Sequence, residues 1–178
     1  ICANSSTLVI SGGGTLNNDN NAIINNQDGA SLTINPGSVI NNQGNATIFN
    51  NDNAIINNNY QFNNTGNATF TNNSVLNTSA SMNNYGTISG SNTSHTSAIS
   101  NYGTFSPGNS PGKYIVDTFI NNTSGIVNIE IEGLGNLANA GITYDTIEIN
   151  GNRGFSGGTL NVTLPTGYDP AIGEEFTI

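Results

Sequence analysis

Positive charge is almost missing from this sequence: Lys113 and Arg153 stand against eleven acidic residues, and the formal net charge is -9. A chain with so few cations cannot neutralise nucleic-acid phosphates or dock on an anionic bilayer. We therefore expect neither nucleic acid nor an acidic membrane as a partner. The chain is also poor in helix-forming Leu and Ala, while Asn, Gly, Ser and Thr dominate, so we expect essentially no helix.

Cysteine and long apolar runs are scarce as well. The single cysteine, Cys2, excludes an internal disulfide framework. It pairs with a second chain, pairs with a cysteine outside this sequence, or stays a small buried residue. No apolar run approaches the roughly 18 residues of a membrane-spanning helix, so we expect no membrane insertion. No signal peptide heads the sequence, and we expect a mature secreted form or an excised piece.

The sequence does contain a loose internal repeat, in which short apolar clusters lie between asparagine pairs. Five segments that end in glycine mark the units, with their glycines 15, 22, 20 and 17 positions apart: Asn25–Gly29, Asn41–Gly44, Asn63–Gly66, Asn83–Gly86 and Ser100–Gly103. Asn21–Asn26 also recurs almost verbatim as Asn53–Asn58. Self-similarity at a period of about twenty residues is typical of a solenoid, in which each unit stacks on the next.

The apolar clusters predict short strands. They are three or four residues long, rich in β-branched or aromatic residues and bounded by Gly, Asn or Pro: Thr7–Ile10, Ser31–Ile34, Ala46–Phe49, Ala68–Thr71 and Thr87–Ser89. Strands this short become stable when each coil hydrogen-bonds to the coils above and below it, about 4.8 Å away. We therefore predict an all-β fold, a right-handed parallel β-helix (β-solenoid) of eight or nine coils with about 20 residues per coil.

Asparagine has two roles in this prediction. It tolerates the left-handed backbone of a corner, so we place the asparagine pairs at the corners between strands. An inward or aligned amide can also donate to, and accept from, the equivalent amide one coil away. The alternative is a disordered, prion-like tract, but such tracts lack recurrent β-branched clusters at a coil-sized spacing.

Charge divides the chain into two regions. Residues 1–105 hold three acidic residues and neither cation, whereas the other eight acidic residues and both cations lie beyond. We interpret 1–105 as an Asn-rich solenoid repeat array, and 106–178 as a C-terminal strand region that continues the solenoid. Gly125–Gly133, in which Ile and Glu alternate, predicts longer strands in this C-terminal third.

Several segments of the C-terminal region are recognisable: Thr104–Gly112, the Ile-Glu-Ile-Glu strand, Tyr144–Asp145, Gly158–Val162 and Gly173–Ile178. Over about residues 85–178 they resemble the C-terminal part of autotransporter-type passenger domains and related secreted bacterial β-strand-repeat proteins. The resemblance implies a right-handed parallel β-helix that is exported and displayed or shed, commonly as an adhesin or surface-layer component. The membrane translocator of an autotransporter is absent from the sequence, which leaves secretion route and anchor open.

Catalysis is plausible for this fold class, since polysaccharide lyases and hydrolases also use parallel β-helices. Glu130 and Glu132 fall on one face of a strand, and we expect Glu148 beside them on the next coil, where they could hold calcium or share protons. A solvated strand face explains these residues more simply. His95, expected in a polar loop, has no Cys or second His to complete a metal site. We assign no catalytic, cofactor-binding or metal residue.

Other motifs have structural explanations. Gly12–Gly14 lacks the Gly-Lys continuation of a phosphate loop, so we expect a turn there. Six tyrosines could stack on sugars if exposed in a row, but we expect several to cap corners or cover the core: Tyr60, Tyr85, Tyr102, Tyr114, Tyr144 and Tyr168. Glycosylation-type sequons follow from a composition rich in Asn, Ser and Thr: Asn4, Asn45, Asn63, Asn67, Asn72, Asn77, Asn92, Asn121, Asn122 and Asn161.

The ends of a solenoid bear on its function, because terminal coils expose unpaired N–H and C=O groups that need a cap or a partner chain. We expect a non-enzymatic, secreted structural or adhesive β-solenoid at the cell surface. It is either a filament subunit, a homo-oligomer formed by end-to-end or donor-strand assembly, or an adhesin segment that contacts carbohydrate or a host surface. A fragment of a longer passenger is the alternative to assembly, and a polysaccharide lyase or hydrolase is the alternative function.

Overall fold

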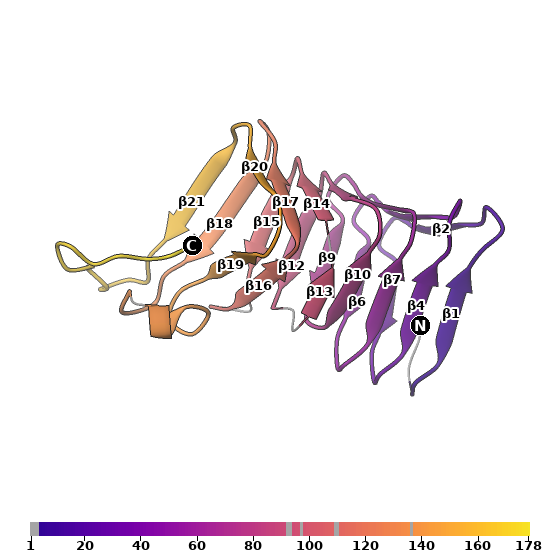
Figure 1. Cartoon of the computed structure of the whole chain (residues 1–178), viewed down its shortest axis with the longest axis horizontal. Coiled ribbons are helices and arrows are strands. Elements are labelled where there is room, and N and C mark those ends of the chain that lie inside the picture. The colour runs from indigo at the N-terminus through magenta and orange to yellow at the C-terminus, as the bar shows by residue number, and fades with distance from the viewer. Residues whose placement is uncertain (1–3, 92–93, 97, 109–110, 136) are drawn as a thin grey trace.

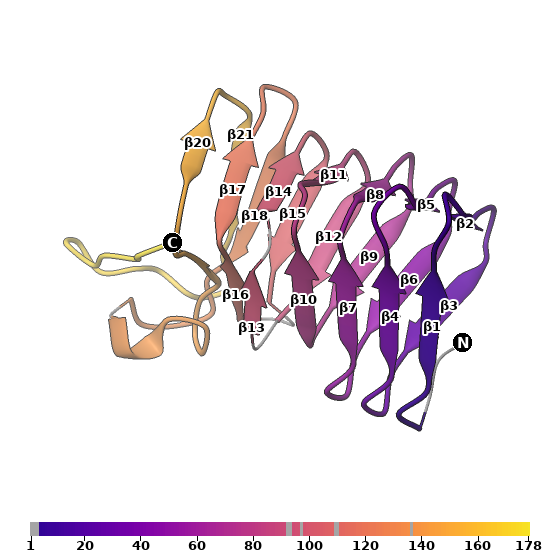
Figure 2. The ribbon, with the colours of Figure 1, turned by 45° about the vertical axis from the view of Figure 1, so that its right-hand side comes forward.

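The chain folds into a three-sided β-solenoid. The computed structural model describes residues 4–91, 94–96, 98–108, 111–135 and 137–178. Within them, seven successive coils each add one strand to each of three faces, and every paired strand is parallel to its neighbour. Figures 1 and 2 show the coils advancing from the N-terminal to the C-terminal end in a right-handed sense, as parallel crossovers require. The predicted right-handed parallel β-helix is therefore confirmed.

Each face collects one strand from each coil. The first face is divided into two sheets, one of β1 (Thr7–Ile10), β4 (Ser31–Ile34), β7 (Ile55–Asn58), β10 (Val75–Thr78) and β13 (Ser94–Thr96), and a second of β16 (Lys113–Val116) and β19 (Thr146–Ile149). The second contains β2 (Thr15–Asn18), β5 (Val39–Asn42), β8 (Gln61–Asn64), β11 (Met82–Asn84), β14 (Ala98–Asn101), β17 (Thr118–Asn121) and β20 (Arg153–Phe155). The third contains β3 (Ile23–Asn26), β6 (Thr47–Asn50), β9 (Thr69–Asn72), β12 (Thr87–Gly90), β15 (Thr104–Pro107), β18 (Ile126–Glu130) and β21 (Thr159–Thr163).

The smallest repeating unit is one strand with its turn, which is a third of a coil. The first seven strands begin at every eighth residue, from Thr7 to Ile55. The near-verbatim copies Asn21–Asn26 and Asn53–Asn58 therefore fall on different faces, in β3 and β7. The predicted period of about twenty residues describes the whole coil, whose length falls from 24 residues at the N-terminal end to 17 in the middle of the solenoid.

The prediction of eight or nine coils is wrong, because the last coil is much longer than the others. Its register pairs Asn128 with Asn161, 33 residues later. The excess lies in a loop that leaves the solenoid between Ile131 and Tyr144, both of which stay in the core, and that includes a short 3-10 helix, η1 (Leu137–Asn139). Residues 164–178 form no strand at all. The strands lengthen only slightly in this region, since β18 and β21 have five residues.

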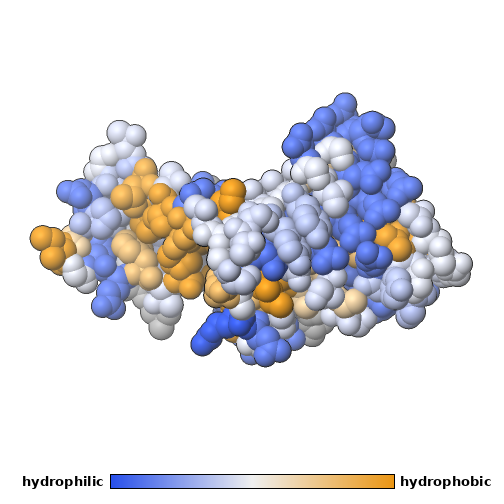
Figure 3. Space-filling view, turned by 90° about the horizontal axis from the view of Figure 1, so that it is seen from above, coloured by the Kyte–Doolittle hydropathy of each residue, from blue (hydrophilic) through white to orange (hydrophobic). Residues whose placement is uncertain are grey.

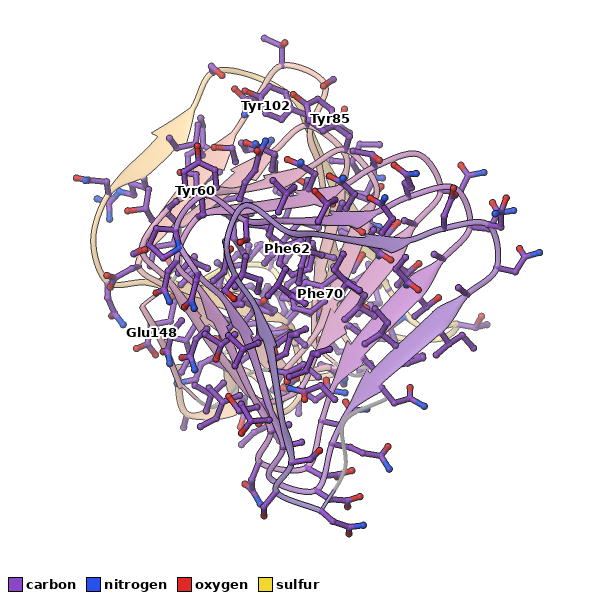
Figure 4. All side chains as sticks on the ribbon, turned by 90° about the vertical axis from the view of Figure 1, so that its right-hand side faces the viewer. Tyr60, Phe62, Phe70, Tyr85, Tyr102 and Glu148 are labelled. Carbon is purple, nitrogen blue, oxygen red and sulfur yellow. The ribbon has the colours of Figure 1, made fainter. Side chains whose placement is uncertain are left out.

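The core is a stack of apolar columns with one residue from each coil. In the middle coils, exposure alternates along each strand, so every second side chain faces inward and is fully buried. The column through the second face, for example, runs Ile40, Phe62, Met82, Ile99 and Phe119. Figure 4, which looks along the solenoid, shows Phe62 and Phe70 inside the coils and Tyr60, Tyr85 and Tyr102 on the outer rim.

Some corner residues must adopt a left-handed backbone conformation, and others must be small because the neighbouring coil leaves no room for a side chain. Positive φ occurs at Asp28 and Asn53, where short polar side chains are tolerated. Space is the limit at Gly103, where an added Cβ would lie 2.3 Å from the carbonyl oxygen of Gly86 one coil earlier. The expected turn at Gly12–Gly14 is confirmed, since it links β1 to β2 and the Gly14 N–H donates to the Ser11 carbonyl.

Candidate functional site: asparagine ladders and open ends

Asparagine side chains form a hydrogen-bonded column inside the solenoid, which we call the long ladder. Each Nδ2 donates to the Oδ1 of the next coil at 2.7–2.8 Å, through Asn18, Asn42, Asn64, Asn84, Asn101 and Asn121. The same nitrogen also donates to a main-chain carbonyl of the third face, as from Asn42 to Thr69 at 2.9 Å. These six residues are at most 3% exposed. The predicted contact between stacked amides is confirmed.

The corner positions predicted for asparagine pairs are wrong. The pairs are the last two residues of strands: Asn41–Asn42 in β5, Asn63–Asn64 in β8 and Asn83–Asn84 in β11 lie on the second face, and Asn25–Asn26 in β3 lies on the third. Because side chains alternate along a strand, the first amide of each pair faces outward and the second faces the core. The pairing of amides between coils offsets the low intrinsic strand preference of asparagine.

A second inner column, the short ladder, lies at the ends of the third-face strands. Asn26 donates to Asn50 at 2.9 Å, and Asn50 donates to Asn72 at 2.7 Å. The ladder then stops, because Gly90 lies next to Asn72 on the following coil. The amide of Asn72 instead donates to the hydroxyl of Tyr114 at 3.3 Å. Burial raises the pKa of Tyr114, so this hydroxyl stays protonated.

Asn58 shows that a ladder depends on the face as well as on the sequence. It ends the second copy of the repeated hexapeptide and aligns with Ile34 on one side and Thr78 on the other. Its side chain is fully buried, and its Nδ2 has no hydrogen-bond partner among the described residues. The side-chain nitrogen is thus satisfied at Asn26, where other asparagines follow, and unsatisfied at Asn58.

The outer faces carry neutral amides and hydroxyls in regular columns. Asn63 donates to Asn41 at 3.0 Å, and Asn41 donates to Asn17 at 2.9 Å, which forms an outer ladder beside the long ladder. On the third face, outward threonines follow one another from coil to coil: Thr47, Thr69, Thr87 and Thr104. Two of the sequon asparagines, Asn72 and Asn121, are buried ladder members, so the folded solenoid cannot present them for glycosylation.

The tyrosines do not form one exposed row. Tyr114 and Tyr144 are fully buried, as expected for tyrosines that cover the core. Tyr85 and Tyr102 stack on each other at the corner between the second and third faces, with ring centroids 4.6 Å apart and planes 9° apart. Tyr60 is exposed at a different corner. The expectation that several tyrosines cap corners or cover the core is confirmed.

The acidic residues do not assemble as predicted. Glu148 lies on the first face, where it pairs with Lys113 at 2.8 Å, and not beside Glu130 on the third face. The long final coil is the reason, since it places β19 and not β21 about twenty residues after Glu130. The residue that does meet Glu130 is Asp145, whose Oδ2 accepts from the Glu130 N–H at 2.9 Å.

Asp145 was not singled out as a site residue, yet it is the titratable group with the most altered environment on this side of the solenoid. It is 2% exposed, and its Oδ1 accepts from the Gly112 N–H at 2.8 Å. Burial raises the pKa of Asp145 to about 6, and the Glu130 and Glu132 carboxylates act in the same direction, against the two main-chain hydrogen bonds. It lines a hollow of about 720 Å³ with residues of β15, β18 and β21.

The single histidine lies in a strand. His95 belongs to strand β13, not to a loop, and aligns with Leu76 of β10. Cys2 lies outside the described residues. In the described part of the chain, no three His, Cys, Asp or Glu side chains gather in a way that could hold a metal ion. The same residues include no helix with the length and hydrophobicity to cross a membrane.

The two ends of the solenoid differ in chemistry. At the C-terminal end, Phe155 aligns with Asn121 and Leu160 with Val127, and both side chains are more than half exposed. Figure 3 shows apolar surface gathered at this end, whereas the N-terminal part is largely polar. At the N-terminal end, the ladders begin at Asn18 and Asn26.

No family model, curated protein or solved structure matches the chain. Function is therefore inferred from the fold, the ladders and the ends.

Proposed function

We propose that this chain is a non-enzymatic, extracellular structural β-solenoid that joins end to end with further β-coils, as a filament subunit or an adhesin segment. The observation that carries the proposal is that coil-to-coil strand pairing on the second and third faces continues without a break from one end of the solenoid to the other. Strands β1, β2 and β3 at one end, and β19, β20 and β21 at the other, each pair with one neighbouring strand only. Strands with one unpaired edge are templates for another chain.

The C-terminal end supports association most directly. Phe155, Leu160 and Val162 occupy positions that are inward in the preceding coils, but they are 63%, 56% and 47% exposed. An apolar hollow of about 310 Å³ lies beside them, and Ile178 contributes to its lining. A contiguous apolar patch of this kind marks an interaction surface, because burying it removes apolar area from water. Copies of this chain are the simplest partners for it.

The outer faces support an adhesive role. Amide and hydroxyl columns at the coil repeat of about 4.8 Å offer donors and acceptors without charge. Such a surface suits uncharged, hydroxyl-rich ligands, so carbohydrate on a cell or host surface is the proposed ligand class. The resemblance of residues 85–178 to autotransporter-type passengers points to the same setting, and we propose a secreted, surface-displayed protein of that kind.

Sedimentation velocity over a range of concentrations tests the assembly. We expect association that strengthens with concentration, and the double variant Phe155→Ser/Leu160→Ser should weaken it by about tenfold or more, which corresponds to about 1.4 kcal/mol. Ile142→Ser is the matched control, because Ile142 is also exposed but lies in the loop that leaves the solenoid. A folded chain that stays monomeric at every concentration would overturn the assembly.

A carbohydrate-active enzyme is the second candidate, favoured by the hollow that Asp145 and Glu130 line. A carboxyl group with a pKa of about 6 can exchange a proton near neutral pH, and two carboxylates flanking a sugar are the usual requirement of glycoside hydrolysis. Incubation with plant and bacterial polysaccharides tests this candidate. Product release that is lost in Glu130→Gln and Asp145→Asn would support it, and no release from any polysaccharide would remove it.

A further inference from the structure

Two stacked tyrosines lie on the outside of the solenoid, at the corner between the second and third faces. We call Tyr85 and Tyr102 the tyrosine pair; their ring centroids are 4.6 Å apart and their planes 9° apart. Tyr85 is 53% exposed and Tyr102 is partly exposed, and Figure 4 shows both on the outer rim. In the described part of the chain, no group hydrogen-bonds to either hydroxyl. The pair therefore offers apolar ring surface and two free hydroxyls to a ligand.

The chain turns more sharply in the two coils that carry the pair. Only two residues, 85–86 and 102–103, join the second-face strand to the third-face strand there, whereas four residues do so in the coils on either side: 65–68 and 122–125. Glycine makes the short connection possible, because an added Cβ at Gly86 or Gly103 would lie 2.3 Å from a carbonyl oxygen of the preceding coil. A two-residue corner extends less far than a four-residue corner. The pair thus lies in a step between longer turns.

The corner itself does not require tyrosine. At this position, the main-chain N–H donates to the carbonyl of the long-ladder asparagine one coil earlier. In the other coils the residue that makes this hydrogen bond is Gln43, Thr65 or Asn122. The main-chain geometry of the corner therefore accepts several polar residue types. Two aromatic residues in successive coils, with more than half of the first one in water, point to a role beyond the fold.

Uncharged polar side chains flank the pair on both faces. Asn83 and Ser100 align with each other and point outward, two residues before the tyrosines. Thr87 and Thr104 also align and point outward, two residues after them. Amides and hydroxyls can both donate and accept hydrogen bonds. Residues 53–112 contain no Asp, Glu, Lys or Arg, so these coils offer no charge to a ligand.

We propose that the tyrosine pair is a binding site for one sugar unit of an uncharged polysaccharide. A sugar ring has apolar C–H faces and polar hydroxyls, so it matches an exposed aromatic ring that is flanked by neutral donors and acceptors. The sugar packs on the exposed surface of Tyr85, and Tyr102 holds that ring from the other side. The flanking amides and hydroxyls bind the hydroxyls of the sugar. This inference rests on the proposed adhesive function and gives it a position and a ligand charge.

Affinity electrophoresis of the full chain in native gels tests the proposal. Each gel contains one uncharged polysaccharide (hydroxyethylcellulose, xyloglucan, galactomannan or dextran), the anionic polygalacturonate, or no polysaccharide as the reference. The net charge of -9 moves the chain through the gel, and binding retards it. We expect retardation by at least one uncharged polysaccharide and none by polygalacturonate. Tyr85→Ala should weaken binding by about tenfold or more, whereas Tyr85→Phe, which keeps the ring, should weaken it by about threefold or less.

Tyr60→Ala is the matched control, because Tyr60 is similarly exposed, at 48%, but lies at a different corner. It should leave binding unchanged, and circular dichroism checks that each variant is folded. Tyr85→Trp introduces the single tryptophan of the chain, so its fluorescence reports occupancy at this position without relying on the alanine variant. We expect a saturable change in emission with the polysaccharide that retards the chain.

Three results would overturn the proposal. Binding that survives Tyr85→Ala, or an unchanged emission from Tyr85→Trp during binding, would remove this site and leave the adhesive function standing. Equal retardation by polygalacturonate would show that the ligand is not selected for lack of charge. Retardation by none of the uncharged polysaccharides would remove both the site and the proposed ligand class. Sedimentation velocity measures the assembly separately, so it can hold or fail on its own.

Discussion

The column that begins at Asn26 changes chemistry half-way along the solenoid. In the N-terminal half it is polar, with three stacked amides that end at Asn72. In the C-terminal half the same column passes to Ile129 and Val162, which are apolar. Tyr114 lies at the junction, where its hydroxyl accepts from Asn72 and its ring packs 5.0 Å from Phe105.

A parallel β-helix can therefore fill the space at the inner ends of its strands in two ways. Amides fill it when every member has a partner on the neighbouring coil, and apolar groups fill it by close packing. The amide solution depends on an unbroken column, because one missing member leaves two neighbours unpaired. The apolar solution tolerates changes of residue, since the second-face column passes through Ile40, Phe62, Met82, Ile99 and Phe119 in successive coils.

The largest effect is expected for Asn64→Leu in the middle of the long ladder. Asn42 would lose its acceptor, Asn84 would lose its donor, and the carbonyl of Thr87 would lose its partner. With a cost of roughly 1–3 kcal/mol for each buried group left unsatisfied, we expect a loss of about 3–5 kcal/mol in the free energy of unfolding. Urea denaturation followed by circular dichroism measures it.

A substitution of one apolar residue by another in the core provides the control. Phe105→Leu lies in the packed half of the solenoid and should cost about 1–1.5 kcal/mol, because it keeps most of the buried volume. A loss below about 1 kcal/mol for Asn64→Leu would contradict the view that the ladder depends on every member.

The junction at Tyr114 gives the next largest effect. Tyr114→Phe removes the hydroxyl that accepts from the buried Asn72 amide, and we expect a loss of about 2 kcal/mol in unfolding free energy. The double variant Tyr114→Phe/Asn72→Leu tests the coupling, since replacing both members of a buried pair by apolar groups costs less than the sum of the single changes. Additive losses in a double-mutant cycle of chemical denaturation would show that the two halves are not joined through this contact.

Much of the fold can be predicted from the sequence, and the reason is local. Segments such as Thr7–Ile10 and Ser31–Ile34 combine β-branched residues with turn residues on both sides, and both became strands with the predicted bounds. Strands such as Val39–Asn42 were missed because asparagine is rare in strands and common in turns. Their stability comes from amides one coil away, which no local pattern reveals. The eight-residue spacing of the early strands is the signal that could have identified them.

The acidic site was harder to predict, because its contacts join distant segments. Asp145 accepts hydrogen bonds from main-chain groups 33 and 15 residues away. The expected position of Glu148 assumed that the last coil had the same length as the others. Residues 131–145 break that spacing, so no periodic argument could place Asp145 beside Glu130.

In the charged, C-terminal half, the stability of the fold should depend on the titration of Asp145. Its folded pKa of about 6 lies above the unfolded value of about 3.9, so the ionised carboxylate destabilises the fold above pH 6, and the penalty disappears as the pH falls toward 4. We expect the wild-type chain to gain roughly 1–2 kcal/mol from this group between pH 7 and pH 4. Asp145→Asn should flatten that part of the pH profile. Identical profiles would show that another group titrates.

The smallest effect is expected on the outer face of the same strand that carries Asn64. Asn63 donates to Asn41 at 3.0 Å, as an inner ladder amide does, but water competes for its groups because the side chain is only partly buried. Asn63→Ser should therefore change the unfolding free energy by no more than about 0.5 kcal/mol. Because Asn63→Ser and Asn64→Leu introduce different residues, Asn64→Ser is measured beside them, and thermal and urea unfolding of the two serine variants isolates burial as the variable. A cost for Asn63→Ser close to that of Asn64→Ser would mean that stacking of amides along the solenoid, and not their removal from water, makes the ladders stabilising.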